Sequence, residues 1–586
     1  MATLTELERK QIAEAEELLF SGEQKEGFAK ALFLGEFHAG AMLPYPDQPA
    51  ESRKRGDEVV EQIADYCREN IDPAQIDREA RIPDSIVEGL GELGVLGMTL
   101  SPENGGRGLS QFNYCRVMEV IGGHCASTGV FVNAHHSIGV RALHLFGSEE
   151  QKEKWMRPMA EGKKIAAFAL TEPQAGSDAS NVRTIAVPTS DGKAYKINGS
   201  KRWITNGGIA DVLTVMARTP DDDDAEGKIS AFLVTPDMPG FKVIEERMEK
   251  NSIRGTATGR LEFEDMVVPK ENILGPKGKG LRVALTVLDF GRTTFGACCT
   301  GAAKFCVERL AHRANTRRQF GKNLGEFELV KKKLAEAVAE TYAMESATYH
   351  TAALIDSGAH DYMVETAMLK VFASDSLWRI ANDTLQVWGG AGFFMDQPFE
   401  RIMRDARLNL VGEGANDVLR CFVAMVGLRG LKAKVDEGYT SLMKMQMLAP
   451  KVPCEHDDLQ FMARTISKQI FQLSWACRFQ GRKHQEAILN RQFVQARLGD
   501  AATEIFMMSC VFSRLSSLMS NGTVEQPIKD REMATGMMYC RMARSRNRQR
   551  FDEIRANFDD DYVKTADHWL NFDYSDTHWN IDPQSD

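Results

Sequence analysis

Apolar residues recur at helical spacing in the first and last parts of the chain and at strand spacing in between. Before residue 164, runs such as GDEVVEQIADYCREN and PDSIVEGLGELGVLG place apolar side chains along one face of a helix. Between about 165 and 280, short apolar runs such as KIAAFAL, DVLTVMA and ISAFLVTP are separated by turn signals. Asp191-Gly192 and Asn198-Gly199 are the dipeptides that favour hairpin turns there. From residue 281 onward the helical spacing returns in long stretches.

This pattern predicts a mainly α-helical chain with an inserted β domain and an extra C-terminal helical domain. A chain of 586 residues also exceeds what one hydrophobic core usually fills. The expected domains are an N-terminal helical domain (1–164), a β domain (165–280), a helical bundle (281–428), a linker (429–454), and a C-terminal helical domain with a polar tail (455–586).

Charge and cysteine usage exclude several classes of protein. A net charge of -10 argues against nucleic acid as a main partner. The eleven cysteines show no paired CxxC spacing, which favours buried thiols in a reduced compartment. His135 and His136 are adjacent and would point in different directions on a helix, so no metal site is predicted. With neither a bilayer-spanning run nor a signal peptide, the expected location is the cytoplasm.

Two segments of the β domain carry candidate chemistry. FALTEPQAGSD, residues 168–178, leads from a strand into a turn rich in small and hydroxyl residues, which offers donors to an anionic or carbonyl-bearing ligand. It lacks the GxGxxG spacing of a dinucleotide-binding βαβ unit, so that fold is excluded here. An ordinary loop is the alternative. In KRWITNGG, residues 201–208, Trp203 is either a core side chain or part of a ligand site.

Two further segments lie in the helical bundle. TRRQFGK, residues 316–322, combines three cations with an aromatic side chain and could either grip phosphates or form a charged face. QVWGGAGF, residues 386–393, has glycines where a helix should stop. Those glycines indicate either a helix C-cap or a close approach of the backbone to a ligand.

The segment FERIMRDARLNLVGEGANDVLR contains the candidate catalytic residue. Glu400 with Arg404 and Arg401 with Asp405 lie at i,i+4 spacing, so these charges can pair on one helix face. Glu413 has no such partner in sequence and lies at a break between two helices. It is therefore either a solvent-exposed, inert carboxylate or a base held in a cavity.

Taken in order, these motifs resemble the acyl-CoA dehydrogenase family over about residues 60 to 428. The additional helical block after 428 and the first 55 residues resemble its very-long-chain subgroup. The resemblance implies a helical, β, helical arrangement with FAD between the β domain and the second helical bundle. It also implies a homodimer in which each flavin touches both subunits.

Residue by residue, the resemblance implies two binding sets. The cofactor set comprises Phe168, Leu170, Thr171, Ser177, Trp203, Ile204, Thr205, Arg317, Phe320, Gln386, Gly389, Gly390, Ala415, Asn416 and Asp417. Within it, Arg317, Phe320, Gln386, Gly389 and Gly390 match positions that reach the neighbouring subunit's flavin. The substrate set comprises Ser177, Asp289, Phe290, Gly291, Arg292 and Gly414.

Glu413 matches the family's catalytic base. The implied reaction removes a proton beside the thioester of a long or very-long-chain acyl-CoA while a hydride leaves the adjacent carbon. The product is a trans-2-enoyl-CoA of fatty acid β-oxidation, and the electrons pass to an electron-transferring flavoprotein. Such chemistry needs a carboxylate whose pKa is raised by burial. Gly412 and Gly414 would let the backbone approach the substrate closely.

Departures from the family pattern concern the shape of the cavity. Gly412 stands where an aromatic residue is usual, and Ala415 where a threonine is usual. By analogy the segment STGVFVNAHHSIG, residues 127–139, lines the acyl tunnel. There Val130 and Ala134 favour long chains, whereas the polar Asn133 weakens that inference.

Two alternatives share the predicted fold. One is an acyl-CoA oxidase that uses oxygen, and the other is an interaction or assembly flavoprotein. Retention of Glu413 argues against a purely binding role, because a binding protein has no use for a base there. The linker lysines, Lys432, Lys434, Lys444 and Lys451, leave open a peripheral membrane contact beside the alternative of a lysine-flanked loop.

Overall fold

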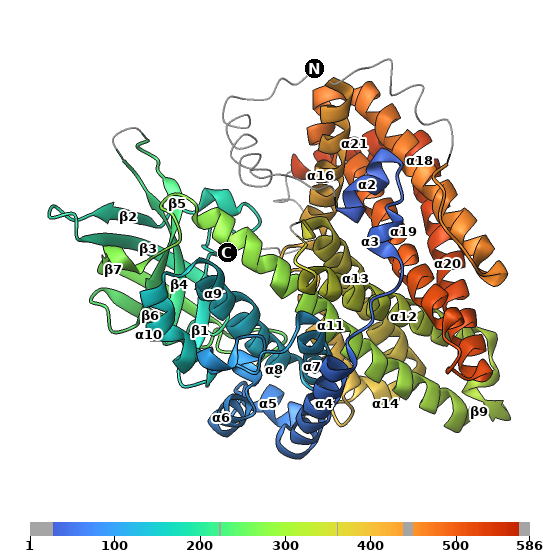
Figure 1. Ribbon diagram of the computed structural model, residues 1–586, viewed down its shortest axis with the longest axis horizontal. Coiled ribbons are helices and arrows are strands. Elements are labelled where there is room, and N and C mark those ends of the chain that lie inside the picture. Colours follow the sequence, from blue (N-terminus) through green and yellow to red (C-terminus); the bar gives the residue numbers. More distant parts are fainter. Residues whose placement is uncertain (1–26, 222–223, 360, 437–448, 573–586) are drawn as a thin grey trace.

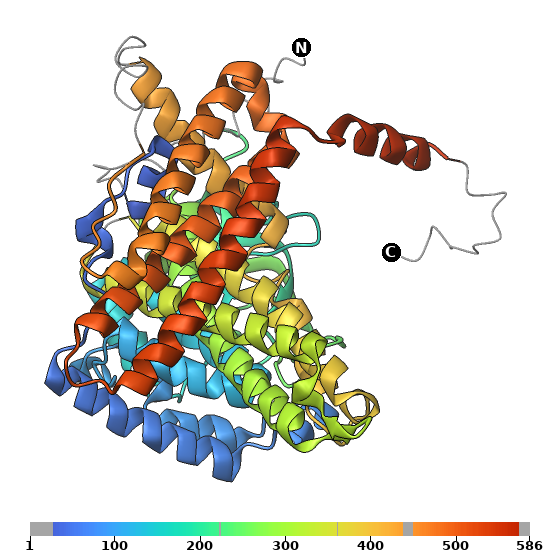
Figure 2. The same ribbon diagram turned by 90° about the vertical axis from the view of Figure 1, so that its right-hand side faces the viewer.

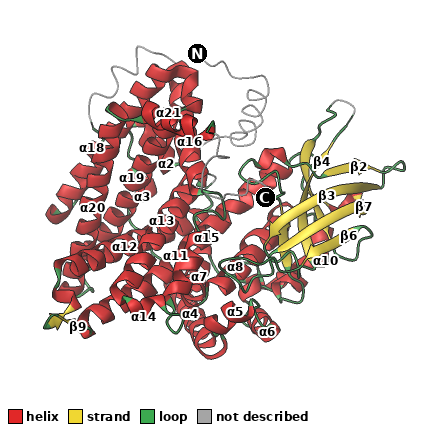
Figure 3. Cartoon of the chain, turned by 180° about the vertical axis from the view of Figure 1, so that it is seen from behind, coloured by secondary structure: helices red, strands yellow, loops and turns green. Residues whose placement is uncertain are grey.

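The strands of the main sheet gather at one end of the molecule, and helices form most of the rest (Figure 1, Figure 3). The computed structural model describes residues 27–221, 224–359, 361–436 and 449–572. The predicted class, mainly α with an inserted β domain and an extra helical domain, is confirmed. Among the described helices, none is long and apolar enough to cross a membrane.

The N-terminal helices form a layer beside the sheet. They are α4 (Ala50–Asn70), α5 (Pro73–Glu79), α6 (Asp84–Glu92), α7 (Gln111–His124), α8 (Ala126–Val132), the π-helical segment η3 (Asn133–Val140), α9 (Arg141–Phe146) and α10 (Glu149–Ala160). α7 packs along α11 (Gly280–Thr316), the first long helix of the second bundle. A π-helix is rare and is frequently found at functional sites, so η3 indicates a candidate site at the junction between these helices and the sheet.

A single sheet makes up the β domain. Its strands are β1 (Ala166–Ala169), β2 (Ile185–Pro188), β3 (Ala194–Ile204), β4 (Val212–Thr219), β5 (Lys228–Val234), β6 (Phe241–Glu245), β7 (Gly259–Pro269) and β8 (Ile273–Leu274). The order is β6-β7-β3-β2-β4-β5-β8, and β1 pairs with β4 in parallel. The strand β6 was not predicted, because most of its side chains are exposed and it shows no buried alternation.

One of the two predicted hairpin turns is present. The Asp191-Gly192 turn joins the antiparallel strands β2 and β3, and Gly192 has a φ of +66°. The turn predicted at Asn198-Gly199 is wrong, because both residues lie inside β3 at a register shift opposite β7. A Cβ atom at Gly199 would lie 2.5 Å from Thr184 Oγ1, so this glycine permits a close approach within a bulged strand.

The second helical bundle carries the turn that contains Glu413. Its helices are α11, α12 (Glu328–Asp356), α13 (Met363–Trp388), α14 (Gly390–Phe393), α15 (Phe399–Leu408) and α16 (Asn416–Asp436). The short strands β9 (Arg318–Gln319) and β10 (Lys322–Asn323) form a hairpin after α11. α16 extends to Asp436, beyond the boundary expected at 428. The side chains of Lys432, Lys434 and Lys444 lie outside the described ones, and Lys451 is exposed.

Three long helices form the C-terminal helical unit: α18 (Gln460–His484), α19 (Gln492–Ser520) and α20 (Gln526–Arg555). α21 (Asp559–Leu570) follows and projects away from the body of the molecule (Figure 2). α19 packs against α20, α18, α12 and α16, so the C-terminal helical unit lies directly on the helical bundle.

Two short helices near the start of the described chain, α2 (Phe28–Leu34) and α3 (Ala39–Met42), do not join the N-terminal helices. All seven residues of α2 are buried, within the same core as α16 and α19. The rings of Phe28 and Phe506 lie 6.3 Å apart, and Arg478 Nη2 donates to Leu34 O. This placement differs from the single domain expected over 1–164, because the partners of α2 are far away in sequence.

Candidate active site

Glu413 lies in the short turn between α15 and α16. The turn is closed by hydrogen bonds from the backbone N–H groups of Gly412 to Leu408 O (2.9 Å) and of Asn416 to Leu410 O (3.0 Å). Glu413 itself has a φ of +58°, in the left-handed region that side chains other than glycine rarely adopt. Such a conformation costs about 1–3 kcal/mol and clusters at functional sites.

The carboxyl group of Glu413 is enclosed although part of the residue is exposed. Its Oε2 atom is buried and, within the described chain, has no hydrogen-bond partner. Burial raises the pKa of Glu413, whereas the positive charges of Arg292 and Lys370 act in the opposite direction. An unpartnered buried carboxyl oxygen is costly, and it is what a base needs if it is to take a proton from a bound molecule.

The substrate set predicted on α11 lies beside this carboxyl group. A Cβ atom at Gly291 would lie 3.2 Å from Glu413 Oε2, so the two residues are in contact. Arg292 Nε lies 3.4 Å from Glu413 O, and Arg292 Nη1 donates to Asp289 Oδ1 at 3.1 Å. The Arg141 guanidinium stacks 4.3 Å from the Phe290 ring centroid. The structure therefore brings Gly291 and Arg292 to Glu413, with Asp289 joined to Arg292.

Asp289 carries the carboxyl group of this segment, and its pKa is shifted. Burial raises its pKa to about 6, although Arg292 and a hydrogen bond from Thr366 Oγ1 (3.0 Å) favour the charged form. Ser177 and Gly414, the other members of the predicted substrate set, are exposed. Gly414 follows the base with a φ of +97°, a conformation that requires glycine.

The first part of the predicted cofactor set comes from two neighbouring β segments. Arg202 N donates to Thr171 O at 3.0 Å, and Lys201 Nζ donates to Leu170 O at 3.1 Å. These bonds hold the loop after β1 against the end of β3. Phe168, Leu170, Thr171 and Thr205 are partly buried and Ser177 is exposed, so all five can be reached from outside the protein.

Trp203 and Ile204 differ sharply in orientation. Trp203 is 50% exposed with a φ of +60°, whereas Ile204 is buried in the core of the β domain. The prediction that Trp203 is more than a core side chain therefore agrees with its exposure. Ile204 can reach a cofactor only through its main chain.

A buried ion pair, missed by the sequence analysis, supports this surface. Lys201 and Glu172 are joined at 2.6 Å with side chains 0% and 3% exposed. Glu172 also accepts hydrogen bonds from Arg183 N and from the backbone and hydroxyl of Thr184. In sequence, the pair was hidden because neither residue stands at helical spacing from the other.

The second part of the predicted cofactor set lies far from the first within one chain. Arg317 precedes the β9–β10 hairpin and Phe320 lies in its turn. Gln386, Gly389 and Gly390 lie where α13 meets α14 (Figure 1). Phe320 is 93% exposed, and a Cβ atom at Gly389 or Gly390 would have no neighbour within 4 Å. These residues form an open surface at the end of the bundle opposite the sheet.

The third part follows the base. Ala415 is partly buried and Asp417 is exposed. Asn416 is buried and already has partners: its amide nitrogen donates to Ser374 Oγ and Asp375 Oδ1, both at 2.9 Å. Its side-chain amide is therefore satisfied within the chain, and the expected cofactor contact at the N-terminus of α16 stays a prediction.

Lys370 of α13 is a residue of the site that the sequence did not reveal. It is fully buried, and its Nζ atom donates to Gly414 O (2.6 Å) and Asn416 Oδ1 (2.8 Å). Burial lowers the pKa of Lys370 to about 8. The only signal in sequence was a lysine inside the apolar run TAMLKVFAS, which is also typical of a side chain that reaches the surface.

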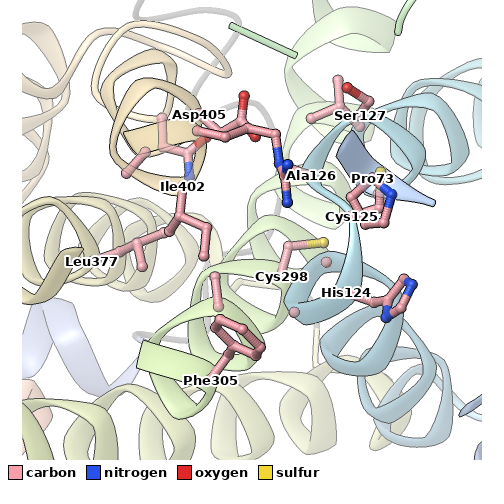
Figure 4. A pocket seen from close by; sticks show the side chains of 18 of the residues that line it. Pro73, His124, Cys125, Ala126, Ser127, Cys298, Phe305, Leu377, Ile402 and Asp405 are labelled. Carbon is pink, nitrogen blue, oxygen red and sulfur yellow. The ribbon is translucent and has the colours of Figure 1, made fainter. Parts of the chain in front are cut away.

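A cavity of about 190 Å³ lies between α7, α8, α11, α13 and α15. Figure 4 shows its walls: His124, Ala126 and Ser127 from one layer face Cys298 and Phe305 of α11, with Leu377, Ile402 and Asp405 opposite. Gly122 and Gly129 let α7, α8 and α11 pack closely at its wall, because a Cβ atom would lie 2.5 Å from Cys298 Cα at Gly122 and 3.2 Å from Gly122 Cα at Gly129.

The predicted tunnel segment lines this cavity in part. Val130 and Asn133 belong to its wall, whereas Ala134 does not, because η3 turns that residue away. Asn133 Nδ2 lies 3.5 Å from Gly291 O, and Thr294 Oγ1 donates to Asn133 Oδ1. Asn133 therefore joins the cavity to the Gly291–Glu413 contact, and the protein itself satisfies its amide.

FAD fits the residues present. The exposed Trp203 and the nearby hydroxyl residues of the β domain form one candidate surface for FAD. Gly389 and Gly390, which have open space beside them, form the other. The carboxyl group of Glu413 has a buried oxygen without a partner in the described chain. Among the described residues, no group of three His, Cys, Asp or Glu side chains is arranged to hold a metal ion.

Four family profiles match successive parts of the chain. Their descriptions are "Acyl-CoA dehydrogenase, N-terminal domain" (54–163), "Acyl-CoA dehydrogenase, middle domain" (167–266), "Acyl-CoA dehydrogenase, C-terminal domain" (278–428) and "ACAD9/ACADV, C-terminal domain" (457–568).

Three individual proteins show how far the similarity extends. The chain is 34% identical to the very long-chain specific acyl-CoA dehydrogenase, mitochondrial, of Homo sapiens, over 91% of this chain and 85% of that protein. It is 31% identical to the probable acyl-CoA dehydrogenase FadE10 of Mycobacterium tuberculosis, over 98% and 93%. The crystal structure of an acyl-CoA dehydrogenase complexed with FAD from Bacillus anthracis superimposes with a TM-score of 0.80 at 27% identity, over 93% and 95%.

Proposed function

Because the chain belongs to the acyl-CoA dehydrogenase family, we propose that it oxidises long-chain acyl-CoA thioesters to trans-2-enoyl-CoA with FAD as cofactor and Glu413 as base. The observation that carries this proposal is the buried Glu413 Oε2 atom, which has no partner among the described residues and lies against Gly291. A purely binding protein would gain nothing from a carboxylate held in this way.

The chain's own residues prepare Glu413 for proton abstraction. The proton on the carbon beside a thioester is a far weaker acid than a solvated carboxylic acid, so the base must be made stronger. Enclosure between α11 and α13 raises the pKa of Glu413 by removing water from the charged form. The positive charges of Arg292 and Lys370 act in the opposite direction on this pKa, so the carboxylate can still form.

The residues that orient the substrate are on α11 and in the turn. The segment Asp289 to Arg292 would hold the thioester end beside the base, with Arg292 fixed by Asp289. Gly291 and Gly414 allow the closest approach, since neither presents a side chain to the reacting carbon. The flavin, when bound, supplies the hydride acceptor next to that carbon.

The cavity beyond Asn133 supports a long acyl chain as substrate. Its lining includes the small residues Gly122, Ala126 and Gly129 and the apolar side chains Val130, Phe305 and Leu377, with the charged Arg401 and Asp405 on one wall. Its wall residue Asn133 lies 3.5 Å from Gly291 O, next to the Gly291–Glu413 contact, where the carbons beside the thioester would lie. The name of the human relative, very long-chain specific, points in the same direction.

A homodimer would complete the cofactor site. Arg317, Phe320, Gln386, Gly389 and Gly390 belong to the β9–β10 hairpin and the α13–α14 junction, whereas Trp203 belongs to β3. Within one chain, β9 and α14 lie away from the sheet (Figure 1). Phe393, Phe394 and Met395 beside them are also exposed, which suits burial against a second copy. Sedimentation of the FAD-loaded protein should give twice the mass of one chain; a monomer that retains FAD would contradict the dimer.

The electron acceptor and the location belong to the same proposal. The family resemblance supports an electron-transferring flavoprotein as acceptor, and the reduced cysteines support the cytoplasm, with peripheral membrane contact still a prediction. Reoxidation by the flavoprotein with little oxygen uptake would support the dehydrogenase. Fast oxygen consumption without the flavoprotein would instead identify an oxidase.

The experiment that tests the proposed function is an anaerobic titration of the FAD-loaded protein with acyl-CoAs of graded chain length. Long chains are expected to bleach the flavin absorbance and short chains to bleach it weakly. If no acyl-CoA bleached the flavin, the chain would be an interaction or assembly flavoprotein of the same fold, and the proposal would be wrong.

A further inference from the structure

A buried lysine of α13 holds the turn that follows Glu413. Lys370 donates to Gly414 O at 2.6 Å and to Asn416 Oδ1 at 2.8 Å, so its ammonium group bridges two positions of the turn. A buried ammonium group needs such acceptors, because an unpaired charge in the interior is expensive. The position of the turn is thereby tied to that of α13.

Asn416 connects the turn to Asp375 and, through Asp375, to Arg420. Its amide nitrogen donates to Asp375 Oδ1 at 2.9 Å, and the other oxygen of Asp375 accepts a hydrogen bond from Arg420 Nη2. Asn416 and Arg420 are one helical turn apart on α16. Each donor in the chain is therefore fixed by the acceptor of the next group.

Arg420 carries the connection into the C-terminal helical unit. Its Nε atom donates to Asp500 Oδ1 of α19 at 2.8 Å, and Asp500 Oδ2 lies 3.9 Å from Arg550 Nε of α20. The two helices touch at this point, because a Cβ atom at Gly499 would lie only 2.4 Å from Arg420 O. α16 cannot shift along its axis here without moving against α19.

We propose that the C-terminal helical unit positions the catalytic base, through the hydrogen-bonded chain Asp500–Arg420–Asp375–Asn416–Lys370. This inference rests on the proposed function, because it requires Glu413 to act as the base. Asp500 and Arg420 are positioning residues, since neither touches Glu413. The charged groups that face Glu413 are Arg292 from α11 and Lys370 from α13, and a shift of the turn changes its distance from both.

The test uses the full-length, FAD-loaded protein with a long-chain acyl-CoA in rapid anaerobic mixing. Asp500→Asn should slow flavin reduction roughly tenfold, because a small displacement of a catalytic group has a large effect on rate. The apparent pKa of the reduction rate should also fall toward that of an ordinary glutamate, since a loosened turn admits water to Glu413. The bound FAD should be unchanged, and Asp500→Glu should recover part of the rate.

Arg420→Lys provides a second variant, because a lysine cannot bridge Asp375 and Asp500 with two separate nitrogen atoms. Its matched control is Arg514→Lys. Arg514 of α19 also bridges two carboxylates, Glu345 of α12 at 2.7 Å and Glu532 of α20 at 3.6 Å, without contacting the turn. The control should keep the parent's rate and pH profile.

Two results would overturn the inference. One is a parent-like rate and pH profile in both Asp500→Asn and Arg420→Lys. The other is an equal slowing and an equal pKa change in Arg514→Lys, which would show a general effect of packing. A parent protein that no acyl-CoA reduces would instead refute the proposed function, and this inference with it.

Discussion

Gly291 leaves the space that the Glu413 carboxyl group occupies: a Cβ atom at position 291 would lie 3.2 Å from Glu413 Oε2 and 3.2 Å from Ile138 Cδ1. The two residues are far apart in sequence, on α11 and in the turn before α16. Their contact defines where the reacting carbons of the substrate must lie.

Gly291→Ala should impair catalysis more than stability. The added methyl group is tight against both neighbours, and overpacking of this kind typically costs about 1–3 kcal/mol. If that cost falls on the reactive geometry, kcat/KM falls roughly tenfold to a hundredfold. The control is Gly481→Ala, on α18, where a Cβ atom would meet nothing within 4 Å. Equal kcat/KM values for the two variants would argue against the contact.

Glu413→Gln should stabilise the protein in a pH-dependent way. Burial raises the pKa of Glu413 in the folded protein above that of the unfolded chain. The folded state therefore holds the proton more tightly, and the parent loses stability as pH rises from the unfolded pKa through the folded one. Glutamine carries no charge and escapes this loss.

Urea unfolding of the two proteins across the pH range checks this prediction. The free energies of unfolding should agree in acid, and the variant should become the more stable as pH rises. A difference that stays constant at all pH values would show that the Glu413 carboxyl group is not desolvated.

Trp203→Ala should weaken FAD binding while leaving the fold intact. The side chain is 50% exposed, so its removal uncovers little core, whereas loss of an aromatic contact with a flavin typically weakens binding by about tenfold. Trp475→Ala is the matched control, because Trp475 is 49% exposed on α18, away from the cofactor surface. Flavin fluorescence titrations should separate the two, and equal affinities would remove Trp203 from the site.

Lys201→Met should destabilise the β domain strongly. It leaves Glu172 buried and unpaired, and breaking a buried ion pair typically costs about 3–5 kcal/mol. Lys242→Met, which removes an exposed pair with Glu264, should change stability little. Denaturant unfolding of the FAD-free proteins measures both, and a small effect in Lys201→Met would show that the pair is not structurally important.

The sequence identified the elements whose signal is local. Glu413 stood out because its neighbours in sequence could not pair with it, and the helical and strand spacings set the order of domains. The turn predicted at Asn198-Gly199 does not form, because the residues of β3 before and after this dipeptide pair with β7. The side-chain partners of Asn416, Ser374 and Asp375, could not be predicted, because they come from a different helix.

The contacts of Lys370 and the packing partners of α2 were not predicted, for a related reason. A lysine in an apolar helix is ordinarily expected to reach solvent, and only the fold shows that Lys370 Nζ meets Gly414 and Asn416 instead. α2 is a short apolar helix whose partners lie in α16 and α19. Contacts between residues this far apart in sequence leave no periodic signal in either segment.

The most direct test of Glu413 as the base is the rate of anaerobic flavin reduction by a long-chain acyl-CoA in the parent and in Glu413→Gln, at equal FAD content. Glutamine keeps the size of the side chain but cannot accept the proton, so the variant should bind FAD and acyl-CoA and show a loss of rate of at least about a thousandfold. If Glu413→Gln reduced its flavin as fast as the parent, another residue would be the base.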